Sequence, residues 1–231
     1  MKKSILGLAL VSLFTSSAAL ASYEAGDFVI RGGITTVSPD SGKAGVYVDA
    51  LGSAETGLSV SVEDDTQLGL NFVYFFDSNW AIEVLAATPF THDVKLHGTT
   101  LGDELDGTTL AEVTHLPPTV SAIYYFDTGT KFQPYVGAGL NYTIFFDEEF
   151  SSGYKDAGMS DLELDGSFGF AVQVGADYQL NEKWHVNASV RYIDISTDVS
   201  FDSGSTLALG DGSAEVDVDP MVYSVMLGYK F

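Results

Sequence analysis

The sequence predicts an all-β protein, an eight-stranded antiparallel up-and-down β-barrel that spans a membrane. Two observations carry this prediction. Segments of roughly ten residues alternate apolar residues with small or polar ones, which is typical of membrane strands with a lipid-facing and an inward face. The chain also ends on an aromatic residue, Phe231, as the closing strand of an outer-membrane barrel does. A soluble half-buried strand shows the same alternation, so the lengths of the connectors must distinguish a membrane barrel from a soluble fold.

The first 21 residues differ from the rest and predict a signal peptide, residues 1–21. A basic tip at residues 2–3 precedes an apolar run at 5–14, and residues 19–21 match the A-x-A pattern of a cleavage site. The mature chain, residues 22–231, is then one outer-membrane β-barrel domain. No other apolar stretch is long enough for a transmembrane helix, so only strands can cross the bilayer.

Eight segments alternate strongly enough to be predicted as strands. In the second, Leu68, Leu70 and Phe72 share one face, whereas Gln67 and Asn71 lie on the other. The even number of strands places both chain ends on one side of the membrane. The predicted strands are residues 27–37, 65–76, 80–92, 113–126, 132–146, 166–180, 184–198 and 217–231.

Connector lengths separate a barrel from a soluble sandwich. Short links alternate without exception with long ones, as expected of tight periplasmic turns and extended outer loops. The short links are 77–79, 127–131 and 181–183, and the long ones are 38–64, 93–112, 147–165 and 199–216. Aromatic residues beside the short turns and the C-terminus predict a belt at the periplasmic membrane boundary. They are Phe76, Trp80, Phe126, Phe132, Tyr178, Trp184, Tyr229 and Phe231.

Charge and composition exclude several function classes. The 231-residue chain has a formal net charge of -22, so we expect no nucleic acid partner. Cysteine is absent, which excludes disulfides, thiolate metal centres and a lipidated cysteine anchor. The four histidines have neither metal-binding spacing nor a tight cluster, and we expect no metal and no cofactor.

Several short motifs together resemble one known family. They are HLPPT at 115–119, YYF at 124–126, PYVGAGLNY at 134–142, DP at 219–220 and GYKF at 228–231. In combination the mature chain resembles the outer membrane protein W (OmpW) family over essentially its whole length. The resemblance implies an eight-stranded barrel in the outer membrane of a Gram-negative bacterium, with a narrow, hydrophobically lined lumen that passes small hydrophobic compounds.

Charged residues on the inward rows predict a polar plug in the lumen. Strand register turns Arg31, Glu83, Asp177, Arg191 and Lys230 inward. An eight-stranded barrel is just wide enough for side chains to fill, so charges inside it must pair to offset desolvation. The plug is either a structural network or a device for gating or proton transfer, and the residues leave both interpretations open.

Apolar residues on the same inward rows predict a ligand channel. Val73, Leu85, Ile123 and Phe145 would be unfavourable in a water-filled pore, which indicates a drier passage. The alternative is that these side chains only fill the interior of a narrow barrel and line no passage. Phe145, near the outer mouth, is the better ligand contact. Residues of the long loops could cover that mouth, namely Leu51, Leu58 and Leu96.

Three prolines predict a lateral gap in the barrel wall. Proline cannot donate to a strand ladder and is disfavoured in central strands. Folding the third predicted strand onto the fourth about Asp103 or Glu104 brings Pro89 opposite Pro117 and Pro118. An apolar ligand could leave sideways into the bilayer where both strands lack donors. A bulge, or the upper end of the paired region, is the alternative.

The long loops hold most of the negative charge. Divalent cations could bridge their carboxylates to lipopolysaccharide, and a merely solvated acidic surface is the alternative. Outer-membrane lipid and lipopolysaccharide are thus the expected partners of a barrel that we predict to be monomeric. The acidic residues are Glu63, Asp64, Asp65, Asp147, Glu148, Glu149, Asp211, Glu215, Asp217 and Asp219.

The function predicted from these features is a narrow, partly hydrophobic channel for passive passage of small hydrophobic molecules, with lateral exit into the bilayer. The alternative is a plugged structural or surface-receptor barrel that acts through its extracellular loops. An enzyme is not expected. His115 and Ser121, a candidate catalytic pair, are six residues apart on one strand and hence roughly 20 Å apart.

Overall fold

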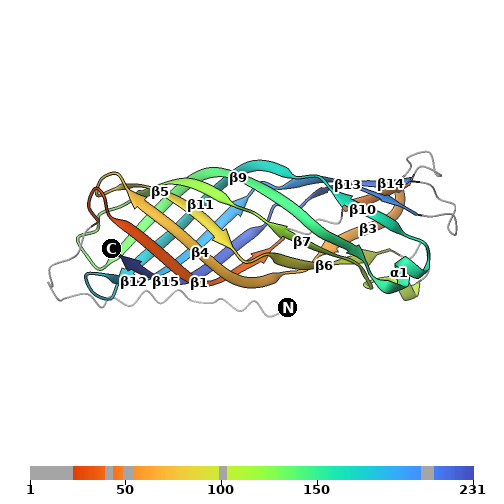
Figure 1. Ribbon diagram of the computed structural model, residues 1–231, viewed down its shortest axis with the longest axis horizontal. Coiled ribbons are helices and arrows are strands. Elements are labelled where there is room, and N and C mark those ends of the chain that lie inside the picture. The colour runs from red at the N-terminus through yellow and green to blue at the C-terminus, as the bar shows by residue number, and fades with distance from the viewer. Residues whose placement is uncertain (1–22, 40–43, 49–54, 99–102, 204–210) are drawn as a thin grey trace, which may run out of the picture.

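The computed structural model describes residues 23–39, 44–48, 55–98, 103–203 and 211–231. The predicted signal peptide and Leu51 lie outside the described residues. Strands dominate the described chain and run along one long cylinder (Figure 1). Among these residues no helix has the length and apolar character that crossing a bilayer requires.

Eight strands close into an antiparallel barrel, which confirms the predicted fold class. β1 pairs with β4 on one side and with β15 on the other, so the ring has no free edge here. Full pairing satisfies the backbone polar groups, as a span through lipid requires. The barrel strands are β1 (Phe28–Ser38), β4 (Asp65–Phe75), β5 (Trp80–Ala87), β8 (Thr119–Tyr125), β9 (Phe132–Phe150), β11 (Ser167–Gln179), β12 (Trp184–Ile193) and β15 (Met221–Lys230).

Much of the chain predicted as long loops forms further strands. They continue the cylinder away from the short turns and pair in the order β10-β13-β14-β2-β3-β6-β7-β9 (Figure 1). The strands of this outer extension are β2 (Ala44–Val48), β3 (Glu55–Val62), β6 (Phe90–His97), β7 (Thr109–Leu116), β10 (Ser160–Leu164), β13 (Ser196–Asp202) and β14 (Asp211–Asp217). Two short helices complete it, η2 (Asp103–Leu105) and α1 (Ser152–Asp156).

Three predicted strands are each split in two by the structure. The segment predicted at 80–92 divides into β5 and β6 around Pro89, and that at 113–126 divides into β7 and β8 around Pro117 and Pro118. The segment predicted at 184–198 divides into β12 and β13. The barrel strands and the extension are therefore distinct ladders, joined most directly by the 19-residue strand β9.

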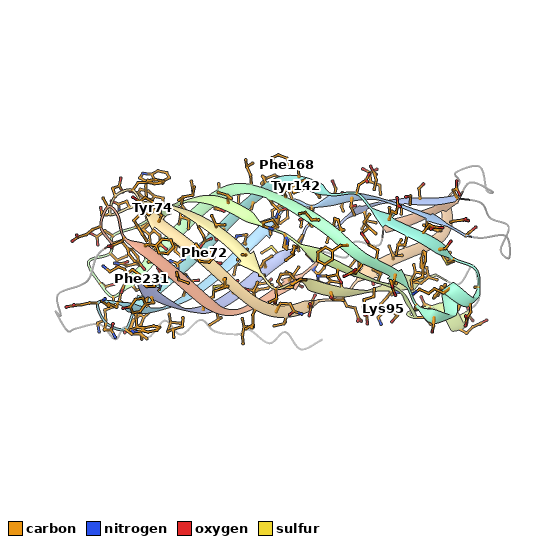
Figure 2. The ribbon with its side chains drawn as sticks, in the orientation of Figure 1. Phe72, Tyr74, Lys95, Tyr142, Phe168 and Phe231 are labelled. Carbon is orange, nitrogen blue, oxygen red and sulfur yellow. The ribbon has the colours of Figure 1, made fainter. Side chains whose placement is uncertain are left out.

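The outside of the barrel is apolar, and its outward rows are the predicted ones. Leu68 and Phe168 are 66% and 69% exposed, which would be unfavourable in water and places this surface in lipid. Phe72, Tyr74 and Phe168 project from the barrel wall, whereas Lys95 projects from the extension (Figure 2). The aromatic rings beside the short turns are exposed as predicted. Tyr229 contacts both Trp184 and Phe231, with ring centroids 4.9 and 4.8 Å apart.

The inside of the cylinder is filled in layers. An apolar cluster lies at the end that bears the short turns, and buried polar and charged side chains follow above it. A second apolar cluster, formed by Val37, Phe90, Ala171, Ile193, Ile195 and Val222, lies above the charges. A third, formed by Leu58, Val60 and Leu96, lies within the extension. Leu58 and Leu96 are thus buried within the extension, and their covering of a mouth beside Phe145 stays a prediction.

Candidate functional site

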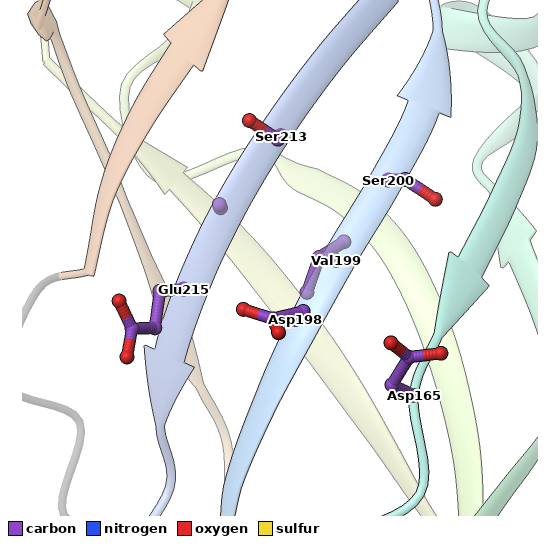
Figure 3. A pocket seen from close by; sticks show the side chains of 7 residues that line it. Asp165, Asp198, Val199, Ser200, Ser213 and Glu215 are labelled. Atoms are coloured by element: carbon purple, nitrogen blue, oxygen red, sulfur yellow. The ribbon is translucent and has the colours of Figure 1, made fainter.

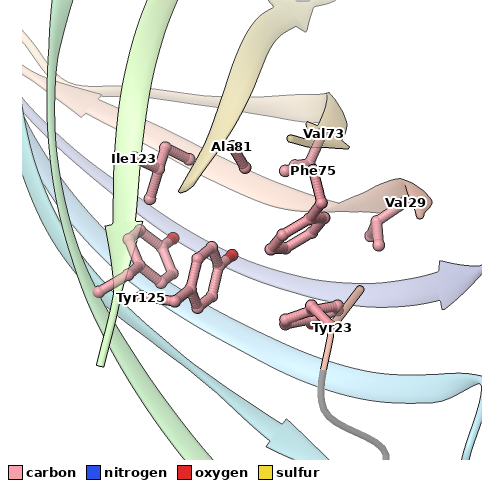
Figure 4. Packing of buried hydrophobic residues seen from close by; sticks show 8 residues of the cluster. Tyr23, Val29, Val73, Phe75, Ala81, Ile123 and Tyr125 are labelled. Carbon is pink, nitrogen blue, oxygen red and sulfur yellow. The ribbon is translucent and has the colours of Figure 1, made fainter. Parts of the chain in front are cut away.

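The lower cluster closes the end of the barrel that bears the short turns. Tyr23, which precedes the first strand, stacks on Phe75 with ring centroids 4.0 Å apart (Figure 4). Its hydroxyl group donates a hydrogen bond of 2.6 Å to Asp177. Val73 and Ile123 belong to the same cluster and are fully buried. They pack in a closed core below the charges, which corrects the prediction that they line a passage together with Phe145.

Two arginines and two carboxylates form the centre of the polar plug. Arg31 pairs with Glu83 at 3.1 Å and with Asp177 at 2.8 Å, and Arg191 pairs with Glu83 at 2.6 Å. All four side chains are at most 1% exposed. Opposite charges balance within this set, because unpaired charges could not remain in so dry a place. The four residues predicted together are therefore in contact.

Neutral groups complete the hydrogen bonding of the plug. The Glu83 carboxylate accepts hydrogen bonds of 2.9 Å from Asn71 and from Gln173. Asp177 accepts a bond of 2.8 Å from Asn187, and Arg31 donates to the hydroxyl group of Tyr125. Arg31 Nε also donates to His185 Nε2 at 3.2 Å. The barrel is thus crossed by a continuous layer of hydrogen-bonded side chains.

Lys230, the fifth residue predicted in the plug, lies inside the rim below the central four. It pairs with Asp27 at 3.2 Å, and both side chains are partly exposed. Its ammonium group lies 6.0 Å from the centre of the Tyr23 ring. Register turns Lys230 inward, but its place near the end of β15 puts it at the level of Tyr23, below the arginines.

The three prolines lie where the wall loses its strand pairing. The β5–β8 ladder ends at Leu85 opposite Thr119, and the β6–β7 ladder begins at Phe90 opposite His115. Residues 86–89 and 116–118 therefore form no ladder pairs with each other. The flanking walls continue here, since the Thr88 amide donates to the Leu68 carbonyl at 3.0 Å and the Tyr142 amide to the Pro118 carbonyl at 3.2 Å.

The buried side chains beside this proline interruption are apolar and polar, and they include two histidines as well as Thr119 and Asn141, which donate to the carbonyls of Pro117 and Pro118. Leu85 is buried, and Phe145 packs half-buried against the second apolar cluster. His92 and His115 stack with ring centroids 5.0 Å apart, although their spacing in the sequence suggested no cluster. Burial, together with the neighbouring His92, lowers the pKa of the His115 imidazole to about 3. Both rings lie on extension strands, outside the lipid-facing belt.

An acidic pocket of about 420 Å³ lies on β13 and β14 (Figure 3). Its lining includes Asp165, Asp198 and Glu215, of which Asp198 and Glu215 are directly opposite in the β13–β14 ladder. Within the described ranges no three histidine or acidic side chains are arranged to hold a metal ion. Cation bridging to lipopolysaccharide therefore stays a prediction.

Comparison with known proteins identifies the family. The OmpW family model matches residues 24–231. Outer membrane protein W of Vibrio cholerae serotype O1 is 43% identical over 232 residues and covers all of both chains. The chain belongs to the OmpW family. It is an outer-membrane barrel of a Gram-negative bacterium, as the motifs implied.

Structures and relatives within the OmpW family agree with the fold. The crystal structure of OprG from Pseudomonas aeruginosa superposes with a TM-score of 0.84 at 42% identity, covering 92% of this chain and 99% of that one. A more distant relative from Pseudomonas aeruginosa, named dibenzothiophene metabolism operon protein PahQ, is 28% identical over 208 residues and covers 90% of each chain. The signal peptide and the monomeric state stay predictions.

Proposed function

We propose that this outer-membrane barrel admits small apolar molecules from outside and releases them sideways into the bilayer at the proline interruption. The observation that carries the proposal is the break in strand pairing at Pro89, Pro117 and Pro118, above a lumen filled by the plug. Pro117 is buried, whereas Pro89 and Pro118 are exposed, so the break reaches from the inner to the outer side of the wall. The name of PahQ ties that relative to metabolism of dibenzothiophene, an apolar aromatic compound.

Free energies favour the sideways route over a straight one. Passage through the plug requires separating ion pairs such as Arg31–Glu83, and breaking one buried pair costs about 3–5 kcal/mol. An apolar molecule that moves from the lumen into lipid instead stays in apolar surroundings and keeps about 0.8 kcal/mol per buried methylene. The upper lumen, lined by Leu85 and Phe145, then serves as the ligand channel and the plug as its floor.

The test restores ladder donors at the break. Replacing Pro117 and Pro118 by valine should slow the uptake of an apolar probe such as naphthalene by complemented deletion cells, because the new amides can extend the β5–β8 and β6–β7 ladders. Pro134→Val is the matched control, since this proline lies within β9 away from the break. Heat-modifiable migration on gels reports that each variant folds. Unchanged uptake by a folded double variant would refute the lateral route.

A second function, a surface receptor that acts through its outer extension, is favoured by the filled lumen. The plug and lower cluster leave Arg31, Glu83 and Phe75 buried, as a closed structural barrel requires. Planar-bilayer conductance combined with apolar uptake in a deletion strain discriminates the two functions. A receptor should show neither, whereas the lateral route predicts uptake without matching ionic conductance.

A further inference from the structure

Two buried histidines lie on the inner side of the wall at the proline interruption. His92 Nε2 and His115 Nε2 are 2.9 Å apart, and His115 comes two residues before Pro117. Phe90 and Phe145 flank the His115 ring with centroids 5.7 and 5.8 Å away. Phe90 and His115 open the β6–β7 ladder directly above the break. A polar ring is therefore held in aromatic surroundings at the point where a ligand would leave the lumen.

The hydrogen bonds assign the tautomers of both rings. His92 Nδ1 lies 2.6 Å from the Glu63 carbonyl oxygen, which can only accept, so Nδ1 of His92 carries a proton. In a neutral His92 ring, Nε2 then holds a lone pair and accepts from Nε2–H of His115. The proton of the neutral His115 ring is thus on Nε2. Its Nδ1 atom is left as an acceptor.

Burial keeps both rings neutral at physiological pH. It lowers the pKa of His92 and lowers that of His115 to about 3. The opposing influences at His92 are its hydrogen bond to Glu63 and the charges of Asp65 and Asp64, and at His115 the charge of Asp65. The acceptor character of His115 Nδ1 therefore holds under the conditions in which the barrel works.

The acceptor on His115 has no hydrogen-bond partner among the described residues, although the side chain is only 5% exposed. The other buried side-chain atoms without a hydrogen-bond partner belong to residues at the level of the plug or beside it. These residues are Asn71, Gln133, His185, Asn187 and Arg191. His115 Nδ1 thus stands apart from them, above the plug and beside Phe90 and Phe145 of the second apolar cluster. An unpaired buried acceptor is unfavourable, and a donor that reaches it is correspondingly favoured.

We propose that His115 Nδ1 accepts a hydrogen bond from the hydroxyl group of an apolar ligand, so that the barrel selects alcohols and phenols over hydrocarbons and ethers. The proposal rests on the proposed route, because the ligand must occupy the lumen beside Phe145 to reach His115. Phe90 and Phe145 receive the apolar body of the ligand, and Nδ1 receives its single donor. Ethers fail because their oxygen cannot donate, and carboxylate anions fail because they only accept.

The direct test is NMR of the unmodified protein in lipid nanodiscs with 15N-labelled histidine. The probes are 1-decanol and decyl methyl ether, which have similar apolar bodies but differ in the donor. Titration with 1-decanol should move the Nδ1 resonance of His115 toward hydrogen-bonded values, and the ether should leave it in place. A resonance that does not respond to saturating 1-decanol, or that responds equally to the ether, overturns the proposal.

Uptake by complemented deletion cells supplies the second measurement. His115→Phe keeps an aromatic ring between Phe90 and Phe145 but removes the acceptor, and should lower the ratio of decanol to ether uptake about fivefold, which corresponds to about 1 kcal/mol. His97→Phe is the matched control, since His97 lies on β6, the strand that pairs with that of His115, but contacts Ser61 and Asp106. A folded His115→Phe barrel with an unchanged ratio overturns the selectivity.

Failure of this proposal differs from failure of the proposed function. If both probes enter through the unmodified barrel and the Nδ1 resonance stays in place, the route stands and the histidine site falls. If the resonance moves with 1-decanol but neither probe enters, the site stands and the lateral route falls.

Discussion

The lower and upper halves of this cylinder are filled by opposite means. Below, Arg31, Glu83, Asp177 and Arg191 are paired with one another and enclosed by hydrogen-bonding neighbours. Above, the second apolar cluster includes Phe90 beside the proline interruption, and His115 keeps an acceptor without a described partner. The buried carboxylates of the lower half are satisfied within the protein, and the upper half keeps an unpaired acceptor beside apolar side chains.

In the proposed function, this difference separates the barrier to ions from the path of the apolar ligand. A paired, neutral plug resists the entry of ions and water because each charge is already solvated by protein groups. An apolar lumen with a broken ladder costs little to occupy and to leave. Retaining the barrier while passing an apolar ligand by the proposed route then requires that the two functions lie at different heights.

Breaking an ion pair of the plug should have the largest effect on the free energy of unfolding. Glu83→Gln leaves Arg31 and Arg191 with a single compensating carboxylate, so the free energy of unfolding should fall by about 3–5 kcal/mol. Urea titration of the barrel in lipid vesicles measures the loss. The control is Lys230→Gln, which breaks the partly exposed pair with Asp27 and should cost below about 1 kcal/mol. Equal losses in the two variants would refute the central role of Glu83.

Loosening the lower cluster should have an intermediate effect. Tyr23→Phe keeps the stack on Phe75 but removes the donor to Asp177, a hydrogen bond to a charged group worth about 1.5–3 kcal/mol. Urea titration should show this loss, while uptake of apolar probes stays unchanged because their route lies above. Tyr124→Phe, on the next row of the barrel wall, is the matched control. Reduced uptake in Tyr23→Phe would contradict the separation of barrier and path.

The barrel was predictable because lipid imposes one apolar row on every spanning strand. The alternation of Leu68, Leu70 and Phe72 follows from that demand, and so does the inward parity of Arg31 and Glu83. The extension was missed as structure because its outward residues face water and need no apolar row. Its inward residues, such as Leu58 and Leu96, form a shorter and less regular signal.

The alternation of residues along each strand predicted which side chains face inward, but not how far along the barrel axis each one lies. Lys230 is inward as predicted, yet it lies at the rim beside Asp27, and Val73 and Ile123 lie below the charges. Tyr23 precedes the first strand and carries no alternation, so nothing marked it as part of the core. The contact between the two histidines could have been predicted from the sequence, because His92 and His115 are equally far from the hairpin centre predicted at residues 103–104.

The smallest of these effects should be the change in stability of the upper half with pH near neutrality. The unfolded chain binds a proton at a histidine near pH 6.5, but burial lowers the pKa of His115 in the folded protein to about 3. Between these values the unfolded state holds more protons, so the stability of the outer half falls as the pH drops through this window and is unaffected above it. Histidine NMR from pH 7 to pH 4 should therefore show a neutral His115 ring throughout.

A His115 titration midpoint above pH 5 would mean that the ring is already charged in mildly acidic solution. Its Nδ1 atom would then carry a proton instead of offering a lone pair, and the upper half would lose the acceptor that the proposed hydrogen bond needs.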